Sequence, residues 1–261
     1  MAPARVTPQI GRMKTFPAAM LALLAAFSCS AQAQDSGWHS LVEPYIMFPN
    51  MKGETGVGNL PLASVDEDPS DIFDNLQMGA MLYFEVRNES WAFSSDVLYM
   101  DLESDLTPHG VISDGKAGVT QLGWELAAMR RVTPWLEVGV SAVYNKIDAD
   151  VDITTSTILG TTTRSAGLSE DWIDPTLVAR ATFPFGTKWS GQLRANLGGF
   201  GVGSDLFWQI QADVVYRQSD KWQFAFGYRV IDFDYDHGSG TGRFVYDMQN
   251  FGPVLKLGYS F

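Results

Sequence analysis

The sequence predicts an all-β fold, a single antiparallel up-and-down β-barrel of ten strands that crosses a membrane. Three observations lead to it. Segments of about ten residues carry apolar side chains at alternate positions, short and long connections between these segments alternate, and aromatic residues gather where the segments begin. The composition agrees, because the chain holds 25 glycines and 13% aromatic residues while only 46% of its residues are hydrophobic.

The first 33 residues are predicted to be a cleaved signal peptide, which leaves 34–261 as the barrel domain. They contain three basic residues and no acidic one, then a short apolar run, and they end at Ala31-Gln32-Ala33. The apolar run is about 12 residues long, whereas a helix needs about 20 residues to cross a bilayer. Met13 is an alternative start to Met1, because a complete signal peptide already begins there.

Charge and cysteine content exclude several classes of protein. With 30 acidic and 18 basic residues the net charge is −12, so the chain has no basic face with which to bind nucleic acid. The single cysteine, Cys29, lies in the predicted leader and excludes both a disulfide framework and a cysteine-based metal site. We expect no metal and no cofactor.

Alternation of side chains supports strands rather than helices. Segments 76–86, 189–197 and 208–217 each have one apolar face and one mixed polar face, because the side chains of a strand point alternately to its two sides. A soluble sandwich or a lipocalin-like barrel would show the same pattern with the apolar face inward. The connections and the C-terminal segment favour the membrane version.

The connections fall into two classes. Four short turns, 87–91, 131–135, 185–189 and 217–222, each open the next strand with a tryptophan, and we expect Trp91, Trp135, Trp189 and Trp222 to form a periplasmic girdle. Longer connections occupy about 50–73, 102–118, 149–171, 198–206 and 235–243. Nine connections join ten strands, and an even number places both ends in the periplasm; eight strands are the main alternative.

The C-terminal segment has apolar residues at alternate positions and ends in phenylalanine. Leu257, Tyr259 and Phe261 resemble the signal by which the barrel-assembly machinery recognises outer-membrane barrels. We therefore expect this machinery to be a partner of the chain.

The polar face is expected to line the barrel interior with a balanced set of charges. The expected acidic members are Glu43, Glu85, Asp96, Glu125, Glu137, Asp174 and Asp213, and the basic ones are Arg87, Arg131, Arg180, Arg194, Arg217, Arg229 and Lys256. Ten strands enclose little more space than side chains can fill, and buried charges persist when paired. The prediction is a salt-bridged, structural interior; an ion-selective pathway would need an excess of one sign.

No catalytic site is predicted. His39, His109 and His237 are the three histidines, and His237 beside Asp234 and Asp236 is the best enzyme candidate, but a loop histidine among acids is typical of an exposed surface. The acidic connections match no calcium loop and are interpreted as solvated, although calcium or magnesium could bridge them to lipopolysaccharide. The glycines of 199–203 are expected to form a tight surface turn rather than a phosphate loop.

Six stretches resemble a family of Gram-negative outer-membrane β-barrel proteins, which groups loosely with small OmpA-like and OmpW-like barrels. The stretches are 70–76, 99–102, 171–175, 198–209, 227–229 and 252–253. The resemblance implies a barrel in the outer membrane, without an OmpA-type peptidoglycan-binding domain, and it implies no activity.

The sequence as a whole predicts a monomeric, non-enzymatic protein of the outer membrane. Its expected partners are membrane lipid and lipopolysaccharide, and its expected role is structural or surface-binding, with a plugged lumen. Two alternatives stay open: a narrow channel for small hydrophobic or ionic solutes, and a barrel enzyme that acts on lipid or peptide.

Overall fold

The structure is a computed structural model, and it describes residues 37–59, 61–105, 112–157 and 160–261. The predicted signal peptide, the alternative start at Met13 and His109 all lie outside these ranges. The signal peptide therefore stays a prediction.

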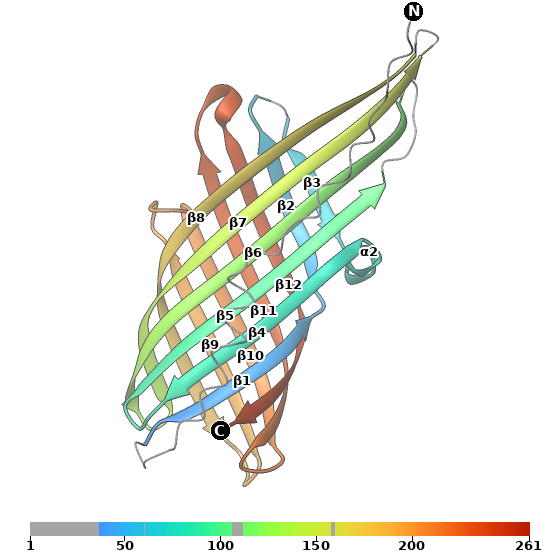
Figure 1. Ribbon diagram of the computed structural model, residues 1–261. Helices are drawn as coiled ribbons and strands as arrows, with labels where there is room; N and C mark the ends of the chain where they lie inside the picture. Colours follow the sequence, from blue (N-terminus) through green and yellow to red (C-terminus); the bar gives the residue numbers. More distant parts are fainter. Residues whose placement is uncertain (1–36, 60, 106–111, 158–159) are drawn as a thin grey trace, which may run out of the picture. The chain divides into compact units, whose positions relative to one another are not determined.

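Ten long antiparallel strands form a closed barrel (Figure 1). They are β1 (His39–Met47), β4 (Leu76–Arg87), β5 (Trp91–Asp105), β6 (Ile112–Thr133), β7 (Leu136–Thr157), β8 (Gly160–Pro184), β9 (Trp189–Gly199), β10 (Leu206–Arg217), β11 (Trp222–His237) and β12 (Phe244–Ser260). Each pairs with its neighbour in the chain, and β1 closes the barrel by pairing with β12. The prediction of ten strands is confirmed, and the alternative of eight is wrong.

The four short turns occur where the sequence predicts them, but the long connections are more strand-rich than expected. Segment 149–171 was expected to be a loop, yet β7 and β8 stay paired from Leu136↔Ala181 to Thr157↔Gly160. Segment 102–118 likewise belongs largely to β5 and β6, which pair as far as Asp105↔Lys116. Segment 149–171 holds six threonines, which favour extended backbone, and the polar residues of both segments were mistaken for loop residues.

The connection expected over 50–73 contains three further elements. β2 (Asn50–Val57) continues the line of β1 along β12, β3 (Ala63–Glu67) pairs with β2, and the short helix α2 (Pro69–Asp74) follows before β4. A 3-10 turn, η2 (Gly240–Gly242), lies between β11 and β12. No helix in the described ranges is long and apolar enough to cross a bilayer.

Asp68 determines where α2 begins. Its carboxylate accepts hydrogen bonds from the backbone N–H groups of Ser70 (2.7 Å) and Asp71 (3.2 Å), and the Asp71 carboxylate accepts one from the Asp68 N–H (3.4 Å). This is a reciprocal capping arrangement, and Pro69 in the first turn has the backbone angle that a helix start requires. The hydrogen bonds from Ser70 and Asp71 hold the pKa of Asp68 below its usual range.

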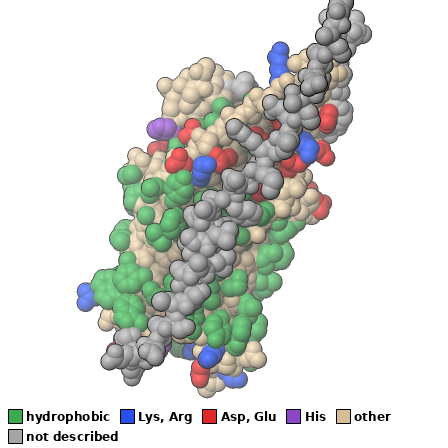
Figure 2. All heavy atoms as spheres, in the orientation of Figure 1, with side chains coloured by type: hydrophobic (Ala, Val, Ile, Leu, Met, Phe, Trp, Pro, Cys, Tyr) green, Lys and Arg blue, Asp and Glu red, His purple; other side chains and the backbone are tan. Residues whose placement is uncertain are grey.

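The two faces of the sheet differ in the sense expected for a membrane barrel. Apolar side chains face outward on every strand of the wall, and among the most exposed are Val140 (59%), Leu177 (58%) and Phe226 (59%). Figure 2 shows such side chains gathered on the wall, with charged side chains above and below them. A soluble barrel would bury this face, so the soluble alternative is wrong.

The tryptophans that open the strands are half exposed at the end of the barrel where both termini of the sheet lie. Trp91 stacks on Phe93, Trp135 on Phe183, and Trp189 and Trp222 contact Tyr216 and Tyr259. The C-terminal residue is tied to the first strand, because Phe261 and Ser40 exchange two backbone hydrogen bonds. Leu257 and Tyr259 lie on β12.

Replacing Val140 with arginine tests whether the apolar belt contacts lipid. Val140 faces outward near the middle of the belt on β7, so we expect Val140→Arg to lower the free energy of unfolding by ~2–4 kcal/mol in bilayers. Urea unfolding of the vesicle-inserted protein measures it. Thr163→Arg, at an exposed site on the extension of β8, is the control; equal effects for the two variants would contradict a lipid-facing belt.

The cap of α2 should depend on pH. A carboxylate whose pKa is lower in the folded protein stabilises the fold above the pKa of the unfolded chain, and this contribution is lost as the pH falls through the folded value. We expect the amide signals of Ser70 and Asp71 to move in an NMR titration below about pH 4. Asp68→Asn keeps a capping oxygen but cannot titrate, so the same movement in this variant would refute the assignment.

Candidate functional site

The interior of the barrel holds a connected cluster of charged side chains. At its centre, Glu137 of β7 accepts hydrogen bonds from Arg180 Nε (2.8 Å) and Nη2 (2.5 Å), from Arg87 Nη2 (2.5 Å) and from Arg131 Nη2 (3.1 Å). These arginines come from three different strands, β8, β4 and β6. One carboxylate therefore ties together strands that lie on different sides of the barrel.

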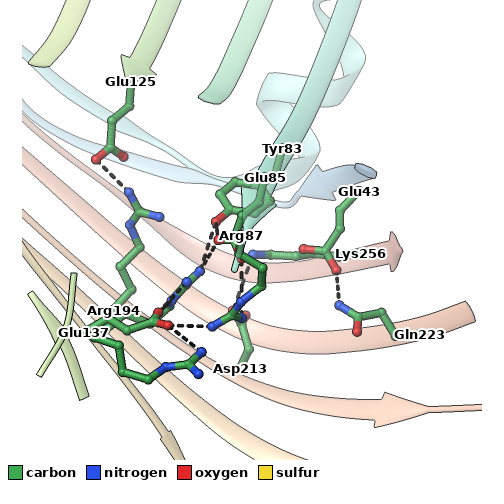
Figure 3. A network of polar contacts seen from close by, with 12 residues as sticks. Glu43, Tyr83, Glu85, Arg87, Glu125, Glu137, Arg194, Asp213, Gln223 and Lys256 are labelled. Carbon is green, nitrogen blue, oxygen red and sulfur yellow. Dashed lines mark hydrogen bonds and ion pairs between the residues drawn. The ribbon is translucent and has the colours of Figure 1, made fainter. Parts of the chain in front are cut away.

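Glu85 of β4 forms the second half of this cluster (Figure 3). It pairs with Arg180 and, at 3.4 Å, with Arg87, and it accepts a 2.6 Å hydrogen bond from Tyr83 Oη. Glu85 and Arg180 lie on strands that are not neighbours in the sheet, so their side chains meet across the bore. Both are almost completely buried, and each charge is neutralised by hydrogen-bonded partners, as a buried ion pair requires.

A second ion pair crosses the bore beside the first cluster. Arg194 Nη2 donates to Glu125 Oε1 (2.8 Å), which also accepts from Asn196 Nδ2 (2.6 Å). The residues belong to β9 and β6, and Figure 3 shows Arg194 and Glu125 reaching toward each other. This pair adds a second bridge across the lumen.

Arg229 of β11 forms the third bridge. Its Nη1 lies 3.1 Å from Asp96 Oδ2 and donates to Tyr45 Oη (3.0 Å), and its Nη2 donates to Gln209 Oε1 (2.7 Å). Tyr45 in turn donates to Asp96 Oδ1 (2.8 Å). Tyr45, Gln209 and Tyr83 were not among the predicted lumen residues, although their positions in the alternation share the inward face.

The remaining predicted lumen residues differ in the kind of partner that they contact. Asp213 pairs with Lys256 at 3.4 Å, and Glu43 accepts a hydrogen bond from Gln223 (2.7 Å). Arg217 lies at the rim of the barrel and, in the part of the chain that the structure describes, makes no ion pair.

Asp174 has neutral partners instead of a cation. It accepts hydrogen bonds from the Ser204 N–H (2.6 Å) and Oγ (3.0 Å), from Trp172 Nε1 (2.9 Å) and from Asn145 Nδ2 (3.3 Å). Ser204 belongs to the connection 200–205, which overlaps the tight turn predicted over 199–203. A Cβ at Gly203 would lie 2.6 Å from Asp174 Oδ1, so glycine is required for the turn to approach this carboxylate. Asp174 therefore fixes the turn to the wall.

The outer half of the interior is apolar, which the sequence analysis did not predict. Side chains from β7, β8, β10, β11 and β12 form one buried cluster; its aromatic members are Trp172, Phe207, Phe233, Tyr235, Phe244 and Tyr246. Trp172 stacks on Tyr235 with ring centroids 4.1 Å apart. The alternation already indicated these positions. Trp172 and Asp174 lie an even number of residues apart on one strand and therefore point to the same face, and so do Phe233 and Arg229.

The enzyme candidate is not assembled. On β11 the side chains of Asp234 and Asp236 face outward, whereas His237 is at an inward-facing position. The ring centroids of His237 and Tyr235 are 6.1 Å apart. Asp236 pairs with Arg243 at 2.5 Å, and this hydrogen bond lowers the pKa of Asp236. No group of three potential metal ligands occurs among the described residues. His39 lies at the start of β1.

Comparison with solved structures identifies the architecture. The outer membrane protease OmpT from Escherichia coli is similar with a TM-score of 0.52 at 9% identity, covering 87% of this chain and 98% of that one. This is the fold of an outer-membrane β-barrel. Ail of Yersinia pestis (TM-score 0.37, 9% identity, 86% and 99% coverage) and the Ralstonia pickettii toluene transporter TbuX (0.37, 9%, 86% and 89%) are also similar.

Sequence comparisons add nothing to this likeness, because no family model and no curated protein matches the chain. The fold and the exposed apolar belt together are those of a protein of the Gram-negative outer membrane. They agree with the resemblance drawn from the sequence.

Removing Arg180 should destabilise the barrel strongly. Arg180→Met leaves Glu85 and Glu137 with fewer cations in a buried site, and we expect a loss of ~3–5 kcal/mol in the free energy of unfolding. Arg217→Met at the rim should cost less than ~1 kcal/mol. Urea unfolding in vesicles measures both.

A compensated variant separates charge from packing. Arg180→Met combined with Glu85→Gln and Glu137→Gln removes the unpaired charges and should recover part of the loss. If the triple variant is no more stable than Arg180→Met, buried charge is not the cause of the destabilisation.

Proposed function

We propose that the protein is a closed outer-membrane barrel, with a structural or surface-binding role and no continuous pore. The observation that carries this proposal is that two layers of side chains, at different heights, close the bore. Ion pairs between strands on opposite sides cross the inner half, and the aromatic cluster fills the outer half. A solute that enters from either end meets one of these layers.

The space between the two layers is small. The cavity in the middle of the lumen has a volume of about 50 Å³ and lies between Arg229 and Glu125 on one side and Phe207 and Phe233 on the other. A cavity of roughly 10–15 Å³ is enough for one water molecule, so this cavity has room for a few water molecules. A second, larger cavity of about 530 Å³ has Glu85 and Arg180 among its lining residues.

The charges of the interior also argue against an ion pathway. Selective conduction needs an excess of one sign around a constriction, whereas Glu85, Glu137 and Glu125 are each matched by arginine. Their hydrogen bonds hold the arginine side chains across the bore. We therefore favour a structural role for these residues over transport.

The outward parts of the barrel suit a role at the cell surface. β6, β7 and β8 extend as a paired ribbon beyond the other strands (Figure 1). Carboxylates of Glu54, Asp234 and Asp247 occupy one row across β2, β11 and β12 above the apolar belt. We propose a monomer that contacts lipid and lipopolysaccharide, that the barrel-assembly machinery inserts, and that carries no enzymatic activity.

Planar-bilayer recording tests the closed lumen. We expect the purified protein to show no discrete openings under an applied voltage, because neither layer leaves a passage. Flotation of the same preparation with lipid vesicles verifies insertion. Discrete, reproducible openings from inserted protein would refute the proposal and favour the narrow channel.

A further inference from the structure

The barrel wall is not paired along its whole height between β1 and β4. The ladder between these strands runs from His39↔Arg87 to Pro44↔Leu82 and ends there. β1 continues to Met47 along β12, and β4 begins six residues earlier, at Leu76, along β5. In the described ranges, residues 45–47 and 76–81 therefore face each other across the wall without a backbone ladder.

A side chain replaces the missing ladder at one point. The backbone N–H of Met47 donates to the sulfur of Met81 at 3.3 Å, where a paired strand would offer a carbonyl oxygen. A thioether is a weak acceptor, and a methionine side chain is flexible and unbranched. The wall at this point is thus held by a group that can move more easily than a β-ladder.

Helix α2 lies over this opening. Ile72 is its buried residue, and Phe73 contacts Phe48 with ring centroids 5.4 Å apart. The carbonyl of Asn75, at the end of the helix, accepts a hydrogen bond from the N–H of Glu103 on β5 (2.9 Å). Figure 1 shows α2 at the side of the barrel, beside the outer end of β4.

Between α2 and the strand edges lies an apolar cavity of about 150 Å³. Its lining includes Ile46, Ile72, Phe73, Leu76, Ala80 and Met81. Met47, Pro49, Met81 and Met100 line both this cavity and the small one in the middle of the lumen. The opening therefore leads from the wall toward the lumen, and three methionines form the boundary.

The opening lies at the height of the apolar belt. Ile46 is 40% exposed and pairs with Leu255 of β12, which is 46% exposed on the same outer face. Leu82, which ends the β1–β4 ladder, is likewise apolar and faces outward. Lipid chains rather than water therefore border the opening on its outer side.

We propose that this opening is a binding site for a small apolar molecule of the size of one aromatic ring, which enters sideways from the lipid. Size and chemistry determine the occupant, because a dry apolar cavity of about 150 Å³ accommodates benzene. Methionine sulfur makes favourable contacts with aromatic rings, and flexible methionines adapt to ligands of differing shape. The inference rests on the wall opening and does not require the lumen to be closed.

Methyl NMR of the full chain in lipid nanodiscs, with ¹³C-labelled methionine methyl groups and benzene as the probe, tests the site. The ring current of a bound benzene should shift the methyl signals of Met47, Met81 and Met100 in a saturable way. Met129 is an internal control, because it is fully buried in a separate cluster with Ala92, Ala127 and Val178. Linear shifts of equal size at all four methyls, or no shifts, would overturn the proposal.

Two substitutions on β4 locate the entrance. Ala80→Trp fills the opening and should abolish the saturable shifts, whereas Leu82→Trp, on the same outer face but within the paired part of the strand, should keep them. Ile46→Trp, at an exposed position on β1, repeats the test should Ala80→Trp not fold. Saturable shifts that persist in a folded filled variant, or that vanish equally in Leu82→Trp, would overturn the proposed route.

Discussion

The satisfaction of backbone hydrogen bonds in lipid is the constraint on which this structure depends. No water is present at the middle of a bilayer to accept or donate bonds, so a sheet can cross it only by closing on itself. The pairing of β1 with β12 achieves this closure, and the two hydrogen bonds between Phe261 and Ser40 extend it to the last residue. Between β1 and β4 the ladder ends at Pro44↔Leu82, and beyond it the side chain of Met81 accepts a hydrogen bond from the Met47 N–H.

The same constraint explains why the interior is so crowded. Ten strands leave a narrow bore, and the inward face of each strand must fill it. In the inner half the filling is polar, and Arg180 satisfies Glu85 and Glu137 together. In the outer half the aromatic cluster around Trp172 fills the space, and the Asp174 carboxylate to which Trp172 donates is satisfied by neutral partners. One barrel thus combines two interiors of different chemistry.

Much of the fold could be predicted from the sequence, because a strand repeats every two residues and a membrane barrel exposes one of its two faces. The partners across the bore could not be predicted in the same way, since the meeting of Arg180 with Glu85 depends on strand tilt and register. The aromatic cluster was missed because the inward face was assumed to be polar at all heights. The capping residues Asp68 and Asp71 were visible but were interpreted as a solvated loop.

The wall opens near the height at which the two halves of the interior meet. The β1–β4 ladder ends near the level where the polar interior gives way to the apolar one. Tyr45, the first residue of β1 beyond that ladder, hydrogen-bonds to Arg229 and Asp96. An apolar molecule that passes Met81 would reach this boundary and meet ion pairs on one side and packed aromatic rings on the other. In a bore that is closed as we propose, it would stop there, and the opening in the wall would be a site for binding rather than a route for passage.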